Sequence, residues 1–290
     1  MTASPTHDTE LHSAVLAWFD EAARDLPWRT DPQPWRVMVS EFMLQQTPVA
    51  RVLPVFDTWI ERWPTPATLA AESPGEAVRA WGKLGYPRRA LRLHASATAI
   101  VARHGGQVPS DLDDLRALPG VGDYTAAAIA SFAFGQRHVV LDTNIRRVFA
   151  RTIDGAEFPH PSISSAERKL ATALLPERDA HRWAAATMEL GAVICTAKSP
   201  KCAICPVEKH CAWNAAGRPV HDGPARRGQA YAGTDRQVRG RLLDVLRASD
   251  GPVTKDSLDR TWDDEGQRER CLASLLADGL VIRDGDRFRL

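Results

Sequence analysis

The chain has 290 residues, of which 44% are hydrophobic and 25% charged, and its formal net charge is +1 at pH 7. This composition is that of a folded globular protein with room for about two domains. It excludes a transmembrane protein, because no apolar run approaches the roughly 20 residues that span a bilayer. The N-terminal residues lack the apolar segment of a signal peptide, so we expect a cytoplasmic protein. The small net charge leaves a nucleic-acid partner open, since such a partner needs only a local basic surface.

The first three quarters of the chain predict successive helices. From Ser13 to Ala216 apolar residues recur at three- and four-residue spacing, with Pro and Gly between the runs. Alternating strand patterns are scarce there. We therefore expect an all-α core over residues 1–217, in which the clearest helical segments are SAVLAWFDEAA (13–23), VSEFMLQQTPVARVLPVFDTWIERW (39–63) and DYTAAAIASFAFG (123–135).

A glycine-containing turn joins two of these predicted helices. The short helix 111–117 runs into Pro119-Gly120-Val121-Gly122, and an apolar helix starts at once. Glycines permit a tight turn and leave the backbone open to a ligand, and amides at a helix N-terminus bind anions. The segment predicts a helix-hairpin-helix that holds a DNA phosphodiester without reading sequence. The alternative is an ordinary helix–helix turn.

Four cysteines follow the last core helix, in the stretch CTAKSPKCAICPVEKHC. Cys195, Cys202, Cys205 and Cys211 are separated by six, two and five residues. One loop can thereby present four thiolates to a single centre, as a [4Fe–4S] cluster requires. Zinc is the rival, but structural zinc sites usually take two close pairs from separate turns. Unrelated buried cysteines are the remaining alternative.

The end of the chain has a different pattern. Residues 218–236 are rich in Gly, Pro and Arg and predict a linker. Three short helical segments follow, and LVIRDGDRFRL (280–290) alternates around an Asp-Gly turn, which indicates a hairpin. We expect residues 237–290 to form a small winged-helix-like domain, with Cys271 as a core residue of its third helix.

These motifs, in this order, resemble the endonuclease III superfamily of base-excision glycosylases and, within it, the MutY-type adenine DNA glycosylases. The resemblance covers roughly Leu26 to Trp213. It implies a two-lobed helix-hairpin-helix glycosylase fold, a [4Fe–4S] cluster, and double-stranded DNA with adenine opposite 8-oxoguanine or guanine as the partner of a monomer. The strings that carry it are LPWR (26–29), VSEFMLQQT (39–47), WGKLGY (81–86), LPGVGDYTAAAI (118–129), VLDTNIRRV (140–148) and MELGAVIC (188–195) with the remaining cysteines.

Base excision needs two carboxyl groups with different roles. An acid protonates the leaving base, and a carboxylate stabilises the oxocarbenium-like sugar. The resemblance implies that Glu41 protonates adenine N7 and that Asp142, with Asn144 beside it, faces the sugar. Taken alone, the position of Glu41 favours a solvated helix-face acid, and that of Asp142 is equally consistent with a helix cap.

Tyr124 bears on whether the enzyme also cuts the strand. Bifunctional relatives have a lysine at this position after the hairpin glycines, and its amine forms a Schiff base. Tyr124 has no amine, and Arg146 replaces the lysine of some relatives with a non-nucleophilic guanidinium. The resemblance therefore implies a monofunctional glycosylase.

The resemblance also implies a set of DNA-contacting residues. Gln45, Gln46 and Thr47 are similar to residues that probe the opposite base, and Leu84 and Tyr86 to residues that wedge beside it. Each has a structural alternative, namely exposed helix surface for the glutamines and a core aromatic for the tyrosine. The adenine pocket and the hairpin complete the predicted set: Arg24, Leu26, Trp28, Val49, Gly120, Val121 and Gly122.

Two other functions compete with adenine excision. A thymine or uracil mismatch glycosylase would share Tyr124 and Asp142, but Glu41 favours a purine, whose N7 needs a proton. A non-catalytic iron–sulfur DNA-binding protein would not need the Glu41 and Asp142 pair. Many relatives carry a C-terminal Nudix-like domain that reads 8-oxoguanine, and the short tail of this chain does not resemble it.

Overall fold

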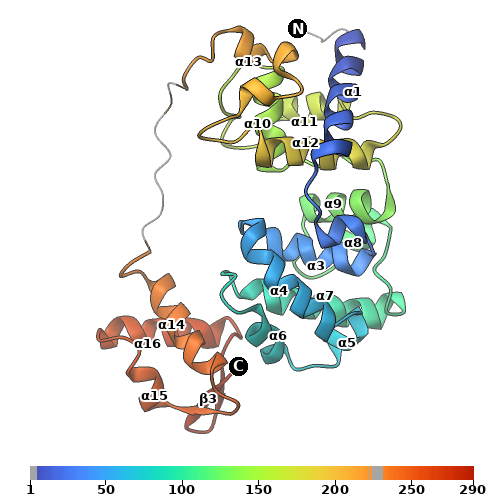
Figure 1. The fold of residues 1–290 in the computed structure, drawn as a ribbon. Helices are drawn as coiled ribbons and strands as arrows, with labels where there is room; N and C mark the ends of the chain where they lie inside the picture. The colour runs from blue at the N-terminus through green and yellow to red at the C-terminus, as the bar shows by residue number, and fades with distance from the viewer. Residues whose placement is uncertain (1–4, 222, 224–230) are drawn as a thin grey trace. The chain divides into compact units, whose positions relative to one another are not determined.

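The computed structural model describes residues 5–221, 223 and 231–290, and the chain divides into two compact units (Figure 1). The predicted all-α core is confirmed, because every strand in the described part of the chain lies after residue 252. No helix among these residues is both long enough and apolar enough to cross a bilayer. Unit 1 consists of Met1–Val37, Ser110–Arg116 and Val121–Pro224, and unit 2 of Met38–Pro109, Ala117–Gly120 and Ala225–Leu290.

Unit 1 is built around the helices α1 (Pro5–Ala22), α10 (Thr143–Thr152) and α12 (Ala180–Val193), which bury apolar faces on one another. The ring of Trp183 stacks on that of Phe149, with 6.4 Å between the centroids, and meets His12 edge-on at 4.3 Å. The helices of this unit are α1 (Pro5–Ala22), α2 (Pro27–Thr30), α8 (Leu112–Arg116), α9 (Asp123–Phe134), α10 (Thr143–Thr152), α11 (Ser165–Ala173), α12 (Ala180–Val193), the 3-10 turns η1 (Cys202–Ile204) and η2 (Glu208–His210), and α13 (Ala212–Ala215).

Helix α10 shows why the core takes this form. Ile145, Val148, Phe149 and Thr152 recur at helical spacing, and all four are buried. This stripe packs α10 against α12. Because the stripe fixes the rotation of the helix, it also fixes the direction of the side chains at its first turn.

Unit 2 begins inside α3 (Pro34–Leu44), which crosses the boundary between the units. The sequence predicts one continuous helical run over residues 39–63, but the structure breaks it between Leu44 and Val49, where Gln46 adopts φ +55°. Three tryptophans fill the core behind the break, with centroids of Trp59 4.6 Å from Trp63 and 5.7 Å from Trp81. The following helices are α4 (Val49–Arg62), α5 (Pro66–Ala70), α6 (Pro74–Trp81) and α7 (Arg88–His104).

The last part of unit 2 has the expected winged-helix order of elements. Its three strands form an antiparallel sheet in the order β1-β3-β2, with Val253 opposite Phe288 and Ile282 opposite Arg289. Strand β1 has two residues and was not expected from the sequence. Helix α14 overlaps the end of the linker predicted for 218–236, of which residues 222 and 224–230 lie outside the described residues. The elements are α14 (Asp235–Arg247), β1 (Val253–Thr254), α15 (Lys255–Asp259), α16 (Glu265–Ala277), β2 (Ile282–Asp284) and β3 (Arg287–Arg289).

Candidate active site and cluster loop

Asp142 is the N-cap of α10 in unit 1. Its Oδ1 accepts hydrogen bonds from the backbone amides of Asn144 at 3.0 Å and Ile145 at 2.7 Å. Its Oδ2 accepts from Nδ2 of Asn144 at 2.7 Å. The carboxylate therefore caps the helix, as the structural alternative predicted, and this capping holds both oxygens in a fixed orientation.

The environment of Asp142 works in two directions on its charge. Burial raises the pKa of the Asp142 carboxyl above its ordinary value, and the donors on Ile145 and Asn144 and the charge of Arg147 offset this only in part. The result is a carboxylate that is ionised less readily than one in water. A carboxylate with few water neighbours interacts strongly with a developing positive charge.

Arg147 connects this carboxylate to the cysteine loop. Its Nη2 donates to Oδ1 of Asn144 at 2.8 Å and to the carbonyl of Gly191 at 2.6 Å, and its Nε donates to the carbonyl of Cys195 at 2.7 Å. Asn144 thus accepts from Arg147 with one end of its amide and donates to Asp142 with the other. The close approach of α12 depends on Gly191, where a Cβ would lie 2.7 Å from Cβ of Asn144.

Tyr124 and Arg146 lie on neighbouring helices of unit 1. Tyr124, on the first turn of α9, is half-buried against the core. Arg146 is buried and forms a bidentate ion pair with Glu167, through Nε at 2.5 Å and Nη2 at 2.9 Å, and donates to the carbonyl of His160. Its guanidinium is thereby committed to holding α11 and the loop before it.

The four predicted cysteines line one cavity of unit 1. Burial raises the pKa of Cys205 to about 12, and it also raises the pKa of Cys211 above its usual range, with the other thiols adding to both effects. Thiolates in such a place need a cationic partner, which iron supplies. No three His, Cys, Asp or Glu side chains in the described part of the chain are placed to hold a single metal ion. The four thiols that line this cavity match the four cysteine ligands of a [4Fe–4S] cluster.

A buried arginine supports this loop. Arg151 is 1% exposed, and its Nη1 lies 3.4 Å from Sγ of Cys195 and 2.8 Å from the carbonyl of Thr196. Its guanidinium carbon also lies 4.6 Å from the ring centroid of Trp213 on α13. Arg151 thereby holds the start of the cysteine loop against α10.

The hairpin glycines have different surroundings. Gly120 adopts φ +80°, and a Cβ there would lie 2.7 Å from Cβ of Arg92, so both conformation and packing require glycine. Gly122 is the N-cap of α9, and nothing lies within 4 Å of the position of a Cβ there. Val121 between them is buried. An anion approaching Gly122 meets open backbone at the start of a helix of 12 residues.

Glu41 belongs to unit 2. It lies on α3 and is 7% exposed, among fully buried neighbours that include Met38, Phe42 and Met43. The position of Glu41 excludes the alternative of a solvated helix-face acid.

One buried arginine organises the two predicted base-probing loops of unit 2. Nη1 of Arg89 donates to the carbonyls of Phe42 and Met43, each at 3.0 Å, and of Gln45 at 2.6 Å. Its Nη2 donates to Oγ1 of Thr47 and to the carbonyl of Gly85, each at 3.0 Å. Burial lowers the pKa of Arg89 to about 10, which leaves it charged at neutral pH.

The residues held by Arg89 differ in exposure. Gln46 and Tyr86 both adopt a left-handed backbone, with φ +55° and +47°, and both are exposed. Non-glycine residues in this region store strain and concentrate at functional sites. Leu84, in contrast, is 3% exposed, and its carbonyl accepts from Oγ1 of Thr47. Among the residues predicted to probe the opposite base or to wedge beside it, Gln46 and Tyr86 are thus the exposed ones.

The predicted adenine-pocket residues are divided between the units. Leu26 and Trp28 are buried in unit 1, whereas Val49 is half-buried at the start of α4 in unit 2. Arg24 pairs with Glu189, its Nε 2.5 Å from Oε1 and its Nη2 2.8 Å from Oε2, and Arg29 adds a bond to Oε2 at 2.8 Å. Burial favours the neutral acid of Glu189, but the two arginines outweigh it and lower the pKa of this carboxyl.

Sequence reasoning assigned no role to Arg89, Arg147 or Glu189. Each lies inside or beside a string that was singled out, yet each acts through partners far away in the chain. The only available signal was an arginine or glutamate within an otherwise apolar helical stretch, which indicates a buried ion pair or hydrogen-bond network.

Two family profiles match the chain. The profile of the HhH-GPD superfamily of base excision DNA repair proteins matches residues 39–172. The profile of the iron-sulfur binding domain of endonuclease III matches residues 195–211, which begin at Cys195 and end at Cys211. With the cavity lined by the four thiols, this match identifies a [4Fe–4S] cluster as the cofactor.

Relatives of known name extend the match to the whole chain. An adenine DNA glycosylase of Mycobacterium tuberculosis strain H37Rv is 54% identical over 291 residues, 99% of this chain and 94% of that protein. The human adenine DNA glycosylase is 41% identical over 213 residues, which are 70% of this chain and 39% of the human protein. A thymine/uracil-DNA glycosylase of Pyrobaculum aerophilum is 35% identical over 205 residues, 69% of this chain and 89% of that protein.

Solved structures agree on the fold. A thermostable thymine-DNA glycosylase superposes with a TM-score of 0.67 and 26% identity, covering 74% of this chain and all of that one. Endonuclease III in a non-covalent complex with DNA superposes with a TM-score of 0.63 and 23% identity, covering 74% of this chain and 99% of that one.

Proposed function

We propose that this chain releases adenine mispaired with 8-oxoguanine or guanine. The premise is that it belongs to the adenine DNA glycosylases of the HhH-GPD superfamily of base excision DNA repair proteins. The reaction is hydrolysis of the N-glycosidic bond without strand cleavage. The enzyme acts as a monomer on double-stranded DNA, in the cytoplasm at the nucleoid.

The half-buried carboxylate of Asp142, which caps α10, carries this proposal. The bond between C1′ and N9 breaks with its electron pair passing to adenine, and the sugar becomes an oxocarbenium-like cation. Asp142 faces that cation with both oxygens oriented by Asn144 and the α10 amides. Water then adds to C1′ and loses a proton, which completes the hydrolysis.

Glu41 supplies the proton that makes adenine a better leaving group. Protonation at N7 withdraws electrons from the bond to C1′, and Glu41 is a buried acid that can act as this proton donor. Position 124 is a tyrosine and not a lysine, and the guanidinium of Arg146 forms an ion pair with Glu167. These features support a reaction in which water, and no protein amine, attacks the sugar.

Thymine or uracil excision is the second candidate. The relative from Pyrobaculum aerophilum is named for those bases and is 35% identical to this chain. A pyrimidine has no N7, so a buried proton donor at Glu41 would have no acceptor of this kind. We therefore place adenine first.

The test is single-turnover base release from duplexes that contain A:8-oxoG, A:G, A:C, T:G or U:G. We expect rapid release from the first two and strand breakage only after alkali. Release confined to T:G and U:G would replace adenine with a pyrimidine substrate. Strand cleavage without alkali would contradict the monofunctional mechanism.

A further inference from the structure

Hydrogen bonds between arginine side chains and backbone carbonyls join the C-terminal domain to α6 within unit 2. Nη1 of Arg79 donates to the carbonyls of Leu246, at 3.1 Å, and Arg247. In return, Nε of Arg247 donates to the carbonyl of Val78 at 3.3 Å. A Cβ at Gly75 would lie 2.4 Å from the carbonyl carbon of Leu290, so the last residue of the chain contacts the start of α6 directly.

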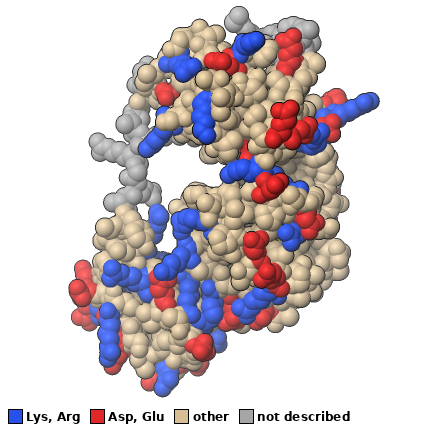
Figure 2. Space-filling model, in the orientation of Figure 1, with Lys and Arg blue, Asp and Glu red and all other residues tan. Residues whose placement is uncertain are grey.

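Charged pairs extend this contact towards the Tyr86 loop. Arg88, at the start of α7, pairs with Asp278 of the C-terminal domain, and Arg239 pairs with the same carboxylate at 2.5 Å. Lys83 lies 3.9 Å from Asp244. Figure 2 shows Lys and Arg side chains gathered where the C-terminal domain meets the rest of unit 2. Two acidic residues of the domain thus neutralise cations on either side of Tyr86.

One arginine of the domain reaches Tyr86 itself. The guanidinium carbon of Arg236, on the first turn of α14, lies 5.7 Å from the centroid of the Tyr86 ring and 5.4 Å from that of Tyr231. The guanidinium of Arg89 lies 5.5 Å from the same Tyr86 ring. Tyr86 is 47% exposed. The ring therefore contacts one arginine of the helical core and one of the C-terminal domain while it stays accessible.

Arg236 differs from its basic neighbours in its charge balance. Within the described residues it is exposed and has no carboxylate partner, whereas Lys83 and Arg88 each have one. Its contacts are aromatic rings, which do not neutralise a charge. An unpaired guanidinium at the edge of an exposed aromatic ring is free to bind an external anion.

We propose that Arg236 binds a backbone phosphate of the DNA strand beside the nucleotide on which Tyr86 stacks, so that the C-terminal domain forms part of the DNA-binding surface. The inference rests on the DNA binding of the proposed function. Base–aromatic stacking is worth roughly 1–3 kcal/mol per base, and a guanidinium binds phosphate through two parallel hydrogen bonds. Because a phosphate contact positions DNA without reading bases, Arg236 contributes affinity equally whichever base lies opposite adenine.

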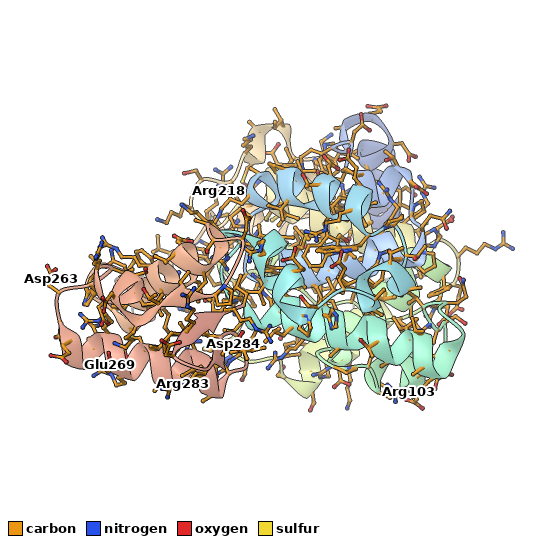
Figure 3. All side chains as sticks on the ribbon, turned by 90° about the horizontal axis from the view of Figure 1, so that it is seen from below. Arg103, Arg218, Asp263, Glu269, Arg283 and Asp284 are labelled. Carbon is orange, nitrogen blue, oxygen red and sulfur yellow. The ribbon has the colours of Figure 1, made fainter. Side chains whose placement is uncertain are left out.

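The test compares Arg236→Ala with the wild type as full-length, cluster-loaded proteins. Affinity is measured against salt on duplexes in which a 2′-fluorine on the adenosine prevents base loss. The slope of log K against log salt should fall by about 0.9, the value for one lost phosphate contact. Arg236→Lys should retain the slope, because it keeps the charge. Arg283→Ala is the matched control, since this exposed residue on β2 (labelled in Figure 3) bonds its own hairpin through the carbonyl of Gly285 and pairs with no carboxylate among the described residues.

The outcomes separate the possibilities. An equal loss of affinity on A:8-oxoG and A:G duplexes, with an unchanged single-turnover rate at saturating protein, supports the phosphate contact. An unchanged salt slope, or a loss confined to the A:8-oxoG duplex, overturns it, the latter in favour of base recognition. Failure of the proposed function would appear separately, as absence of adenine release by the wild-type protein.

Discussion

Asn144 donates its side-chain amide to Oδ2 of Asp142 at 2.7 Å, and its backbone amide donates to Oδ1 of the same carboxylate at 3.0 Å. The side-chain oxygen of Asn144 meanwhile accepts from Arg147 at 2.8 Å. One residue therefore links the carboxylate that we propose faces the sugar to the arginine that holds the cysteine loop. The arrangement makes the charge state of Asp142 sensitive to a single neighbouring amide.

Asn144→Ala should move the acid limb of the pH–rate profile to higher pH. The substitution removes a donor that favours the ionised carboxylate and keeps the Cβ that packs on Gly191. The pKa of Asp142, already raised by burial, should therefore rise further. A hydrogen bond to a charged group is worth about 1.5–3 kcal/mol, which corresponds to roughly one to two pH units. The measurement is single-turnover adenine release between pH 4 and 9, and a uniform loss of rate with an unmoved limb would contradict it.

Asp142→Asn should abolish base release without lowering thermal stability at neutral pH. Because the folded-state pKa of Asp142 is raised, this group contributes stability below its unfolded-state pKa and loses that contribution as pH rises through its folded-state pKa. At neutral pH the ionised carboxylate thus destabilises the fold. Asparagine removes the charge, and its oxygen can still accept from the α10 amides, while its NH2 group faces Nδ2 of Asn144, so the loss of that one hydrogen bond opposes the gain. The melting temperature relative to wild type should be equal or higher at pH 7.5 and should lose any advantage near pH 4.

Glu41→Gln should lower the single-turnover rate by at least about 100-fold, because glutamine has the size of glutamate but no proton to give. Affinity for the uncleaved A:8-oxoG duplex should stay near that of the wild type. Glu61→Gln, an exposed position on α4, is the matched control and should retain full activity. A Glu41→Gln enzyme with a near-normal rate would remove Glu41 from the mechanism.

Sequence periodicity was sufficient for the longer core helices and for α14 and α16, because each buries several apolar side chains, whereas α15 buries Leu258 alone. The capping role of Asp142 was also predictable, since a polar side chain at a helix start has a local partner. The hydrogen bonds of Arg89 and Arg147 were not, because they depend on which distant carbonyls the fold brings close. Strand β1 was missed because two residues carry no alternation.

The contact between Tyr86 and the C-terminal domain was also not predictable from the sequence, because it depends on which distant residues the fold brings together. It depends on Arg236, Asp244 and Asp278, which are ordinary surface charges in the sequence. Polar contacts of this kind leave no periodic pattern. The burial of Leu84 was also not predictable, because the sequence pattern does not distinguish which of Leu84 and Tyr86 packs into the core.

Gly191→Ala should disturb the site through packing alone. An added methyl group would lie 2.7 Å from Cβ and 2.8 Å from the carbonyl oxygen of Asn144, so α12 and α10 must separate. Overpacking of this kind costs about 1–3 kcal/mol, and we expect a lower melting temperature together with slower adenine release. Gly240→Ala on α14 is the control, because its nearest neighbour is 3.5 Å away and alanine favours a helix by up to about 1 kcal/mol. Equal effects of the two substitutions would contradict the packing argument.

Arg89→Lys should loosen both base-probing loops of unit 2. Lysine keeps a positive charge but cannot supply donors to the three carbonyls at the end of α3 and to Thr47 and Gly85 at once. We expect a loss of roughly 2–3 kcal/mol in the free energy of unfolding. Because Arg89 bonds the residues on either side of Gln46 and the residue before Tyr86, the ratio of adenine release from A:8-oxoG to that from A:G should fall more than DNA affinity does.

Arg62→Lys is the matched control for this substitution. Arg62 pairs with Glu72 and Glu76 on the surface of the same unit, and its side chain is 40% exposed. Surface ion pairs of this kind contribute about 0–1 kcal/mol, so the control should leave both the melting temperature and the ratio nearly unchanged. If Arg89→Lys lowered stability and left the ratio of the two rates intact, Arg89 would be a purely structural residue, and discrimination of the opposite base would have to come from side chains that it does not hold.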